Sequence, residues 1–235
     1  MIKELVLVPC NLSQDEVSVL FKERYFLEQL KSIECFWVEN IRSARRFISA
    51  CKTGRNIEEI PFELLDKKTS REKVSSFYKK YAGQRIGILS ESGCPGIADP
   101  GSRAVEIAHQ KGVKVVPMIG PSSILLALMA SGMNGQRFCF HGYIPIDKAA
   151  RKKAIKELER ESLQKNQTQL FIETPYRNNQ LFQELLTTCN DQTFLCVGSD
   201  ISGKKELILT KRIKEWRKVD MDLHKIPTIF LIYAI

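Results

Sequence analysis

Short apolar runs alternate with longer amphipathic segments most clearly between residues 86 and 132. Residues 86–89 are apolar but too few for a helix, and small polar residues that favour a turn follow them, so we predict a strand. Asp99 followed by a proline marks the start of a helix with one apolar face, which ends at Gly112. A valine-rich strand and a strongly apolar helix come next. The pattern therefore predicts a βαβ unit with one further helix.

The same alternation continues on both sides of this unit. Further strands are predicted at residues 5–8, 36–38, 138–140, 170–172, 194–197 and 228–234. Further helices are predicted at residues 14–31, 41–47, 71–81, 148–164, 181–186 and 213–216. Residues 52–70 are polar, contain glycine and proline, and are predicted to be irregular.

This order of elements predicts an α/β protein. The long connections of the first half favour a parallel sheet, whereas the short strand-to-strand spacings of the second half favour a mixed sheet. We therefore expect two α/β domains, residues 1–118 and residues 119–235, with the boundary near the Gly120-Pro121 turn.

Two loops of the central unit, residues 90–100 and 117–123, follow the carboxyl ends of strands. Because ligands of parallel α/β sheets bind at that edge, we expect both loops to line one pocket. Glycine and small residues let the backbone approach a ligand, and the helix N-termini that follow offer free N–H donors, which suits a polar cofactor. The alternative is that glycine and proline serve only to form the turns.

Composition narrows the class of protein. The chain has 235 residues, 43% hydrophobic and 27% charged, as in ordinary globular proteins. Its seven cysteines contain no C-x-x-C pair and its three histidines are scattered, so we expect neither a disulfide framework nor a metal site. The apolar runs are too short to cross a membrane, and the first residues lack a signal-peptide pattern. We expect a cytoplasmic protein that does not bind membranes.

The formal net charge is +9, and the positive side chains gather around residues 42–46, 148–153 and 211–218. Such clusters favour a nucleic acid as partner, because phosphate contacts need a basic surface. The alternative is a solvated cationic face, since no aromatic residues are interleaved with the charges in the manner of a single-strand binding platform.

Four motifs resemble the tetrapyrrole (corrin/porphyrin) methylase superfamily, which uses S-adenosylmethionine. They are LSESGCPGIADPG (89–101), VVPMIGPSS (115–123), FCFHGYIP (138–145) and FIETPYR (171–177), with weaker agreement in WVENIRSARRF (37–47). The motifs occur in the order of the superfamily and near its spacings. Within the superfamily the chain is most similar to the ribosomal RNA small-subunit methyltransferase I family, which implies a homodimer that takes part in rRNA processing.

The resemblance implies two α/β domains with S-adenosylmethionine in the cleft between them. It places cofactor contacts at Pro9, Ser90, Glu91, Ser92, Gly93, Pro95, Ile97, Pro121, Ser122, Ser123, Phe140, Ile172, Glu173 and Thr174. The chain departs from the family in three places, of which one is that it ends with its last predicted strand, where the rRNA enzyme often bears a helical C-terminal extension. The first loop, residues 9–12, lacks the usual glycine, and residues 199–203 replace a motif with a basic member. These departures bear on the RNA substrate more than on the cofactor.

Methyl transfer from a sulfonium is an in-line displacement, so the main task of the protein is to position the acceptor atom. A ribose hydroxyl acceptor must also lose its proton, and Glu91, Glu173 and Asp200 are candidate general bases. Each of these carboxylates could instead cap a loop or pair with an arginine. Arg177 and Arg42 are candidates for binding a substrate phosphate.

The main hypothesis is therefore an S-adenosylmethionine-dependent methyltransferase acting on RNA, with ribose 2′-O-methylation of small-subunit rRNA as its specific form. A first alternative is methylation of a tetrapyrrole or another small metabolite. A second alternative is a non-catalytic homologue that binds RNA or the cofactor, since a fold does not determine a function.

Overall fold

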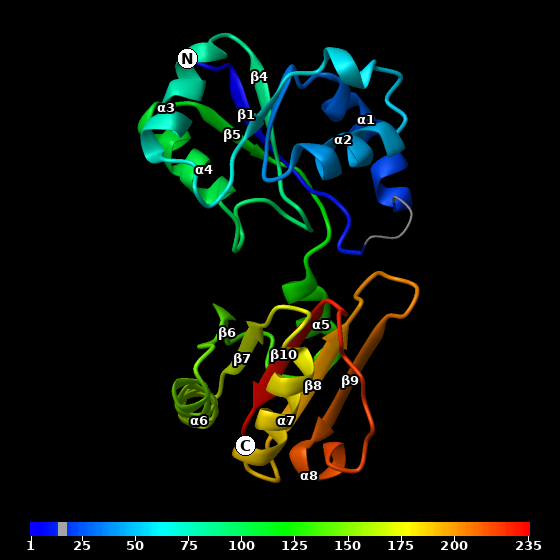
Figure 1. Ribbon diagram of the computed structural model, residues 1–235, viewed down its shortest axis with the longest axis vertical. Coiled ribbons are helices and arrows are strands. Elements are labelled where there is room, and N and C mark those ends of the chain that lie inside the picture. Colours follow the sequence, from blue (N-terminus) through cyan, green and yellow to red (C-terminus); the bar gives the residue numbers. More distant parts are fainter. Residues whose placement is uncertain (14–17) are drawn as a thin grey trace. The chain divides into compact units, whose positions relative to one another are not determined.

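The computed structural model describes residues 1–13 and 18–235. The chain forms two compact units, Met1–Ser122 and Ser123–Ile235 (Figure 1). Each unit contains one five-stranded sheet covered by helices. None of the helices in the described part of the chain is long and apolar enough to cross a membrane.

The first unit is built on a fully parallel sheet with the strand order β3-β2-β4-β1-β5. The strands are β1 (Glu4–Val8), β2 (Cys35–Val38), β3 (Phe62–Leu64), β4 (Arg85–Leu89) and β5 (Lys114–Pro117). The central strands β1 and β4 are apolar after their first residues, Glu4 and Arg85, and Val6 of β1 lies opposite Gly87 of β4. Strand β3 lies in the segment that was predicted to be irregular, because three residues after a proline are too few to show a period.

Helices cover both faces of this sheet (Figure 1). They are η1 (Val19–Lys22), α1 (Arg24–Lys31), α2 (Ile41–Ala50), η2 (Ile57–Glu59), α3 (Arg71–Lys80) and α4 (Gly101–Gln110). One core packs Trp37 against α3 and α4, and the other packs Phe36 near α1 and α2. The prediction of one helix over residues 14–31 was wrong for its described part, because Glu23 has an extended backbone between η1 and α1. Residues 14–17 lie outside the described residues.

The second unit is built on a mixed sheet with the strand order β6-β7-β10-β8-β9. Its strands are β6 (Phe138–Tyr143), β7 (Thr168–Ile172), β8 (Phe194–Ser199), β9 (Leu207–Arg212) and β10 (Thr228–Tyr233). Its helices are α5 (Ser123–Ser131), α6 (Lys148–Lys165), α7 (Asn178–Thr188) and α8 (Ile213–Trp216). Only β6 and β7 pair in parallel. The predicted fold class, a parallel sheet followed by a mixed sheet, is confirmed.

Strand β9 was missed in the sequence because half of its residues are polar or basic. It forms a hairpin with β8 at the edge of the sheet. An antiparallel strand in that position can have one face toward solvent, so it can form with alternating polar and apolar residues and needs no continuous apolar run. The main core of the unit lies on the side of α6, α7 and α8, around Phe171, Trp216 and Phe230.

Candidate functional site

Three loops of the first unit lie together at the carboxyl edge of its parallel sheet. They follow β1, β4 and β5, which are neighbours in the order β4-β1-β5. The loops after β1 and β4 form two backbone hydrogen bonds, from Cys10 N to Gly93 O (2.9 Å) and from Gly93 N to Asn11 O (3.3 Å). The hydroxyl of Ser92 donates to Leu12 O at 3.3 Å. The loop that carries the first cofactor motif is thus joined to the loop after β1.

The loop after β5 reaches the same place. The thiol of Cys94 donates to Pro121 O at 3.3 Å. A Cβ atom added to Gly93 would lie 2.9 Å from Leu12 Cδ2 and 3.2 Å from Pro121 O. Gly93 also has φ +67°, in the left-handed region that favours glycine. Gly93 therefore lies where the three loops meet, and we call this meeting point the loop junction.

Pro9 and Gly120 form a second close contact in the loop junction. A Cβ atom at Gly120 would lie 2.1 Å from Pro9 Cβ, so only glycine fits there. The resemblance expected a glycine in the first loop, where this chain has Pro9. Here the small residue comes from the loop after β5 instead, which keeps the two loops in contact.

Ser90 and Glu91, which follow β4, differ in their surroundings. Ser90 is buried, and its hydroxyl donates within its own loop to Ser92 O at 3.2 Å. Glu91 is exposed, and its carboxylate accepts a hydrogen bond from the hydroxyl of Ser43 on α2. Its backbone N–H donates to the carboxylate of Glu39 at 3.4 Å. Burial raises the pKa of Glu39, although the hydrogen bond from Glu91 opposes this shift.

Asp99 closes the same loop and prepares the start of α4. Its Oδ1 atom accepts hydrogen bonds from Gly96 N (2.8 Å) and Gly101 N (2.7 Å). The helix begins at Gly101 with Pro100 as its N-cap, so the prediction of Asp99 as N-cap was wrong by one residue, and Asp99 accepts from the backbone just before the helix instead. Burial raises the pKa of the Asp99 carboxyl. Between these turns Pro95 is buried and Ile97 is exposed.

In the second unit, Glu173 and Arg177 form an ion pair at the end of β7. Glu173 Oε1 accepts hydrogen bonds from Arg177 Nη2 and from Thr174 N, both at 2.6 Å. The Glu173 side chain is fully buried, whereas that of Arg177 is 33% exposed. Burial would raise the pKa of Glu173, but the hydrogen bonds from Arg177 and Thr174 outweigh it and hold that pKa below its ordinary value.

The other candidates of the second unit are spread along its elements. Phe140 and Ile172 are half-buried in the neighbouring strands β6 and β7, where Phe140 lies opposite Leu170. Asp200 lies in the β8–β9 turn, with φ +47°. Its Oδ2 atom accepts a hydrogen bond from Lys205 N at 2.9 Å, so this carboxylate shapes the hairpin.

Three predicted site residues lie on helix starts or next to them. Arg42 is an exposed residue in the first turn of α2, whose N-cap Asn40 accepts hydrogen bonds from Arg42 N and Ser43 N. Ser122 ends the first unit, and Ser123 is the first residue of α5.

Sequence reasoning did not single out Glu39 and Ser43, although both follow the end of β2 at the same sheet edge.

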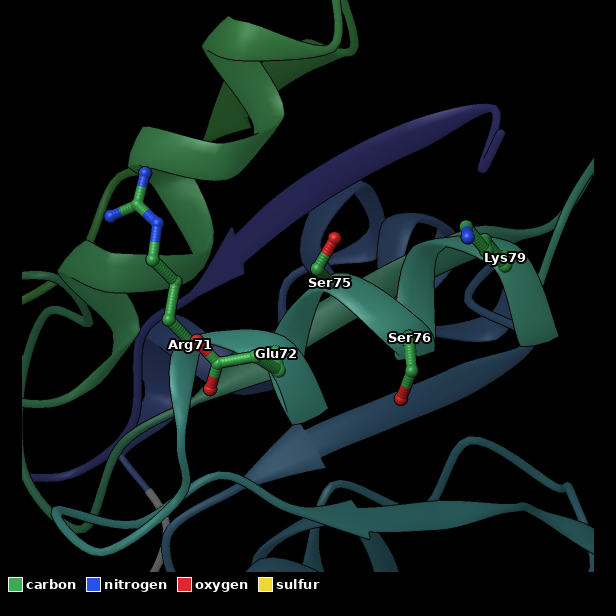
Figure 2. Close-up of a pocket in the computed structure, with 5 residues that line it drawn as sticks. All are labelled: Arg71, Glu72, Ser75, Ser76 and Lys79. Carbon is green, nitrogen blue, oxygen red and sulfur yellow. The ribbon is translucent and has the colours of Figure 1, made fainter.

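A surface hollow on the first unit lies apart from these loops. Figure 2 shows its lining along one helix, α3, formed by Arg71, Glu72, Ser75, Ser76 and Lys79. Arg71 is used to hold α4, since its guanidinium donates to Glu106 and Gln110, each at 2.9 Å. The hollow therefore contains none of the predicted site residues.

Residues 1–13 and 18–235 contain no cluster of histidine, cysteine, aspartate or glutamate suited to a metal.

Comparisons with known proteins agree with the motifs. No protein-family model matches the chain. It is 28% identical over 212 residues to ribosomal RNA small subunit methyltransferase I of Buchnera aphidicola subsp. Schizaphis graminum, covering 88% of this chain and 70% of the relative. The protein of the same name from Vibrio cholerae is 29% identical over 211 residues, with the same coverage.

A solved structure shows the same fold. The crystal structure of the methyltransferase CobJ matches with a TM-score of 0.62 and 16% identity, covering 99% of this chain and 93% of that one. The predicted resemblance is thus confirmed at two levels: the sequence is similar to the rRNA enzymes, and the fold is that of a methylase of known structure.

Proposed function

We propose that this protein, a methyltransferase, uses S-adenosylmethionine and transfers the methyl group to RNA. Its specific reaction would be ribose 2′-O-methylation of small-subunit rRNA, in the cytoplasm. The observation that carries the proposal is the loop junction, where Gly93 contacts the loops after β1 and β5. Three loops meeting at the carboxyl edge of a parallel sheet are the expected place for a cofactor in this fold class.

The residues around the loop junction fit S-adenosylmethionine. Its amino group and ribose hydroxyls are hydrogen-bond donors, and Glu39 and Glu91 supply acceptors at the same sheet edge. The exposed side chain of Ile97 offers an apolar contact for the adenine ring. Glycine at positions 93 and 120 leaves room for close packing of the loops. When bound, the cofactor would supply an electrophilic methyl group on a positively charged sulfur.

The chain itself would position the acceptor and accept its proton. Of the three predicted bases, Glu91 is the best suited, because its exposed carboxylate is oriented by the single hydroxyl of Ser43. Asp200 is used in the β8–β9 turn, and the lowered pKa of Glu173 makes it a weaker base. We therefore assign Glu173 the role of holding Arg177.

RNA is the proposed substrate for three reasons. The sequence relatives are named for rRNA, and the formal charge of +9 favours a polyanion. Arg177 presents a partly exposed guanidinium that is held by a buried carboxylate, an arrangement that suits a phosphate. From the resemblance to the rRNA small-subunit methyltransferase I family we also propose a homodimer. Light scattering on the purified protein would test this oligomeric state.

The test is methyl transfer from labelled S-adenosylmethionine to purified small-subunit rRNA. We expect label in the RNA and, after nuclease digestion, in a 2′-O-methylated nucleoside identified by mass spectrometry. Label in a tetrapyrrole mixture but not in RNA would favour the small-metabolite alternative. Cofactor binding without transfer to either substrate would favour the non-catalytic alternative.

A further inference from the structure

Tyr176 is a strongly exposed aromatic residue in the connection between β7 and α7. Its side chain lies at the surface with 71% of its area exposed. The imidazole of His224 lies edge-on to it, with 6.1 Å between the ring centroids, and Lys225 Nζ lies 5.9 Å from the centre of the tyrosine ring. Both of these residues are exposed as well. An aromatic ring is thus grouped with cationic and ionisable side chains from a segment 48 residues away.

The two segments are joined by several hydrogen bonds. Lys225 N donates to Pro175 O at 3.0 Å, and Asn178 Nδ2 donates to Ile226 O at 2.7 Å. Asn179 completes the connection, since its side chain accepts from Leu223 N and donates to Asp222, both at 2.7 Å. These contacts hold Tyr176 beside Lys225 without help from a ligand, so the surface is pre-organised.

Backbone conformation is unusual at the same point. Lys225 has φ +61°, which is unfavourable for a residue with a side chain. The hydrogen bond to Pro175 O keeps Lys225 in this conformation, next to the tyrosine ring. Strained positions of this kind cluster at ligand-binding surfaces.

Two cationic side chains, Arg177 and Lys225, and two carboxylates, Glu173 and Asp222, lie in the two segments around Tyr176. Arg177 follows it directly, with its guanidinium held by the buried carboxylate of Glu173. The acidic group of the second segment, Asp222, is occupied by hydrogen bonds from Asn179 Nδ2 and His224 N. A planar aromatic face with Lys225 beside it and Arg177 next in the chain is complementary to a nucleotide.

We propose that Tyr176, Arg177, His224 and Lys225 form a docking surface for one unpaired nucleotide of the RNA substrate. The base stacks on the ring of Tyr176, and Lys225 and Arg177 bind the flanking phosphates. This inference rests on the proposed function, because it names how the RNA of that reaction is held. The RNA bound at this surface is single-stranded, since a base within a duplex has no free face for stacking on Tyr176.

The experiment measures binding of a fluorescein-labelled single-stranded RNA of mixed sequence to the full-length protein. Tyr176→Ala should weaken binding about fivefold to a hundredfold, whereas Tyr176→Phe, which keeps the ring, should bind as the wild type does. Tyr25→Ala is the matched control, because Tyr25 is 65% exposed on α1 of the other unit. Its affinity for the RNA should not change.

The contribution of charge is measured separately. Lys225→Ala keeps the Cβ atom and the backbone strain. It should reduce the magnitude of the slope of log K against log salt concentration, where K is the association constant for the RNA, by about 0.7. Lys31→Ala, at an exposed site in the first unit, should leave the slope unchanged. Wild-type binding of fully duplex RNA should be weaker than that of the single strand.

Equal RNA affinities for Tyr176→Ala and the wild type would overturn the docking surface. Equal losses of RNA affinity in Tyr176→Ala and Tyr25→Ala would also overturn it. Failure of the proposed function has a different signature, which is absence of methyl transfer to rRNA by the wild type. Because the binding assay needs no cofactor and no turnover, the two failures are distinguishable.

Discussion

Glu173 and Arg177 are joined by a 2.6 Å hydrogen bond between Oε1 and Nη2, with the carboxylate fully buried and the guanidinium 33% exposed. The pair connects the end of β7 to the start of α7. It gives the arginine a fixed position at the surface of the second unit. The stability of the unit should therefore depend on this pair in a pH-dependent way.

Arg177→Met should destabilise the protein by about 1–3 kcal/mol at pH 7, because it leaves the buried carboxylate of Glu173 without its charged partner. The pKa of Glu173 is lowered in the folded protein, so its stabilising effect is present above the unfolded pKa. That effect is lost as the pH falls through the folded value. Urea unfolding should show the difference between wild type and variant shrinking below about pH 4.3. A difference that grows with acid would contradict this account.

A more deeply buried ion pair, between Arg151 and Glu184, should be more sensitive still. Arg151 Nη2 donates to Glu184 Oε1 at 2.7 Å, and both side chains are largely shielded from solvent. Arg151→Met should cost about 3–5 kcal/mol of unfolding free energy. Arg24→Met, which breaks the exposed pair with Glu28, should cost at most about 1 kcal/mol. Equal losses for the two variants would show that burial does not determine the effect.

Gly120→Ala should disturb the loop junction. The new Cβ atom would lie 2.1 Å from Pro9 Cβ, so one of the two loops must move, at a cost of about 1–3 kcal/mol. Gly135→Ala is the control, because a Cβ atom there meets nothing within 4 Å. Chemical unfolding measures both variants. Equal stability of Gly120→Ala and Gly135→Ala would mean that the contact with Pro9 is not tight.

The fold was predictable where local pattern determines it. Apolar runs such as residues 86–89 indicated strands, and parallel pairing then implied that the loops of Gly93 and Pro121 would meet. The pairing of Tyr176 with Lys225 was not predictable, because it depends on tertiary contacts between distant segments. The charge clusters along the sequence do not indicate it, since Arg177 is adjacent to Tyr176 in the chain but Lys225 comes from another segment.

The roles of the predicted bases were also beyond the sequence. Glu91, Glu173 and Asp200 are equivalent as residue types, and only their partners separate them. Whether a carboxylate is buried against an arginine or exposed beside a serine depends on the packing of helices against the sheet.

Glu91→Gln should lower kcat for RNA methylation by about 10²- to 10⁴-fold if Glu91 is the general base. Affinity for the RNA should change little, because the glutamine keeps the size of the side chain. Glu58→Gln, at another exposed carboxylate of the first unit, should leave kcat unchanged. Single-turnover rates over a range of pH provide the measurement. A kcat within about threefold of the wild type would exclude Glu91 as the base, because the smallest expected loss is about a hundredfold.

Calorimetric titration with S-adenosylmethionine measures whether the loop junction is the cofactor-binding site. Gly93→Ala places a Cβ atom 2.9 Å from Leu12 Cδ2 at a positive φ. Gly83→Ala imposes the same kind of positive φ with nothing within 4 Å. We predict that the wild type and Gly83→Ala bind the cofactor alike and that Gly93→Ala binds it at least about tenfold more weakly, a loss of about 1.4 kcal/mol. Equal affinity of Gly93→Ala and Gly83→Ala, or no binding by the folded wild type, would contradict cofactor binding at the loop junction.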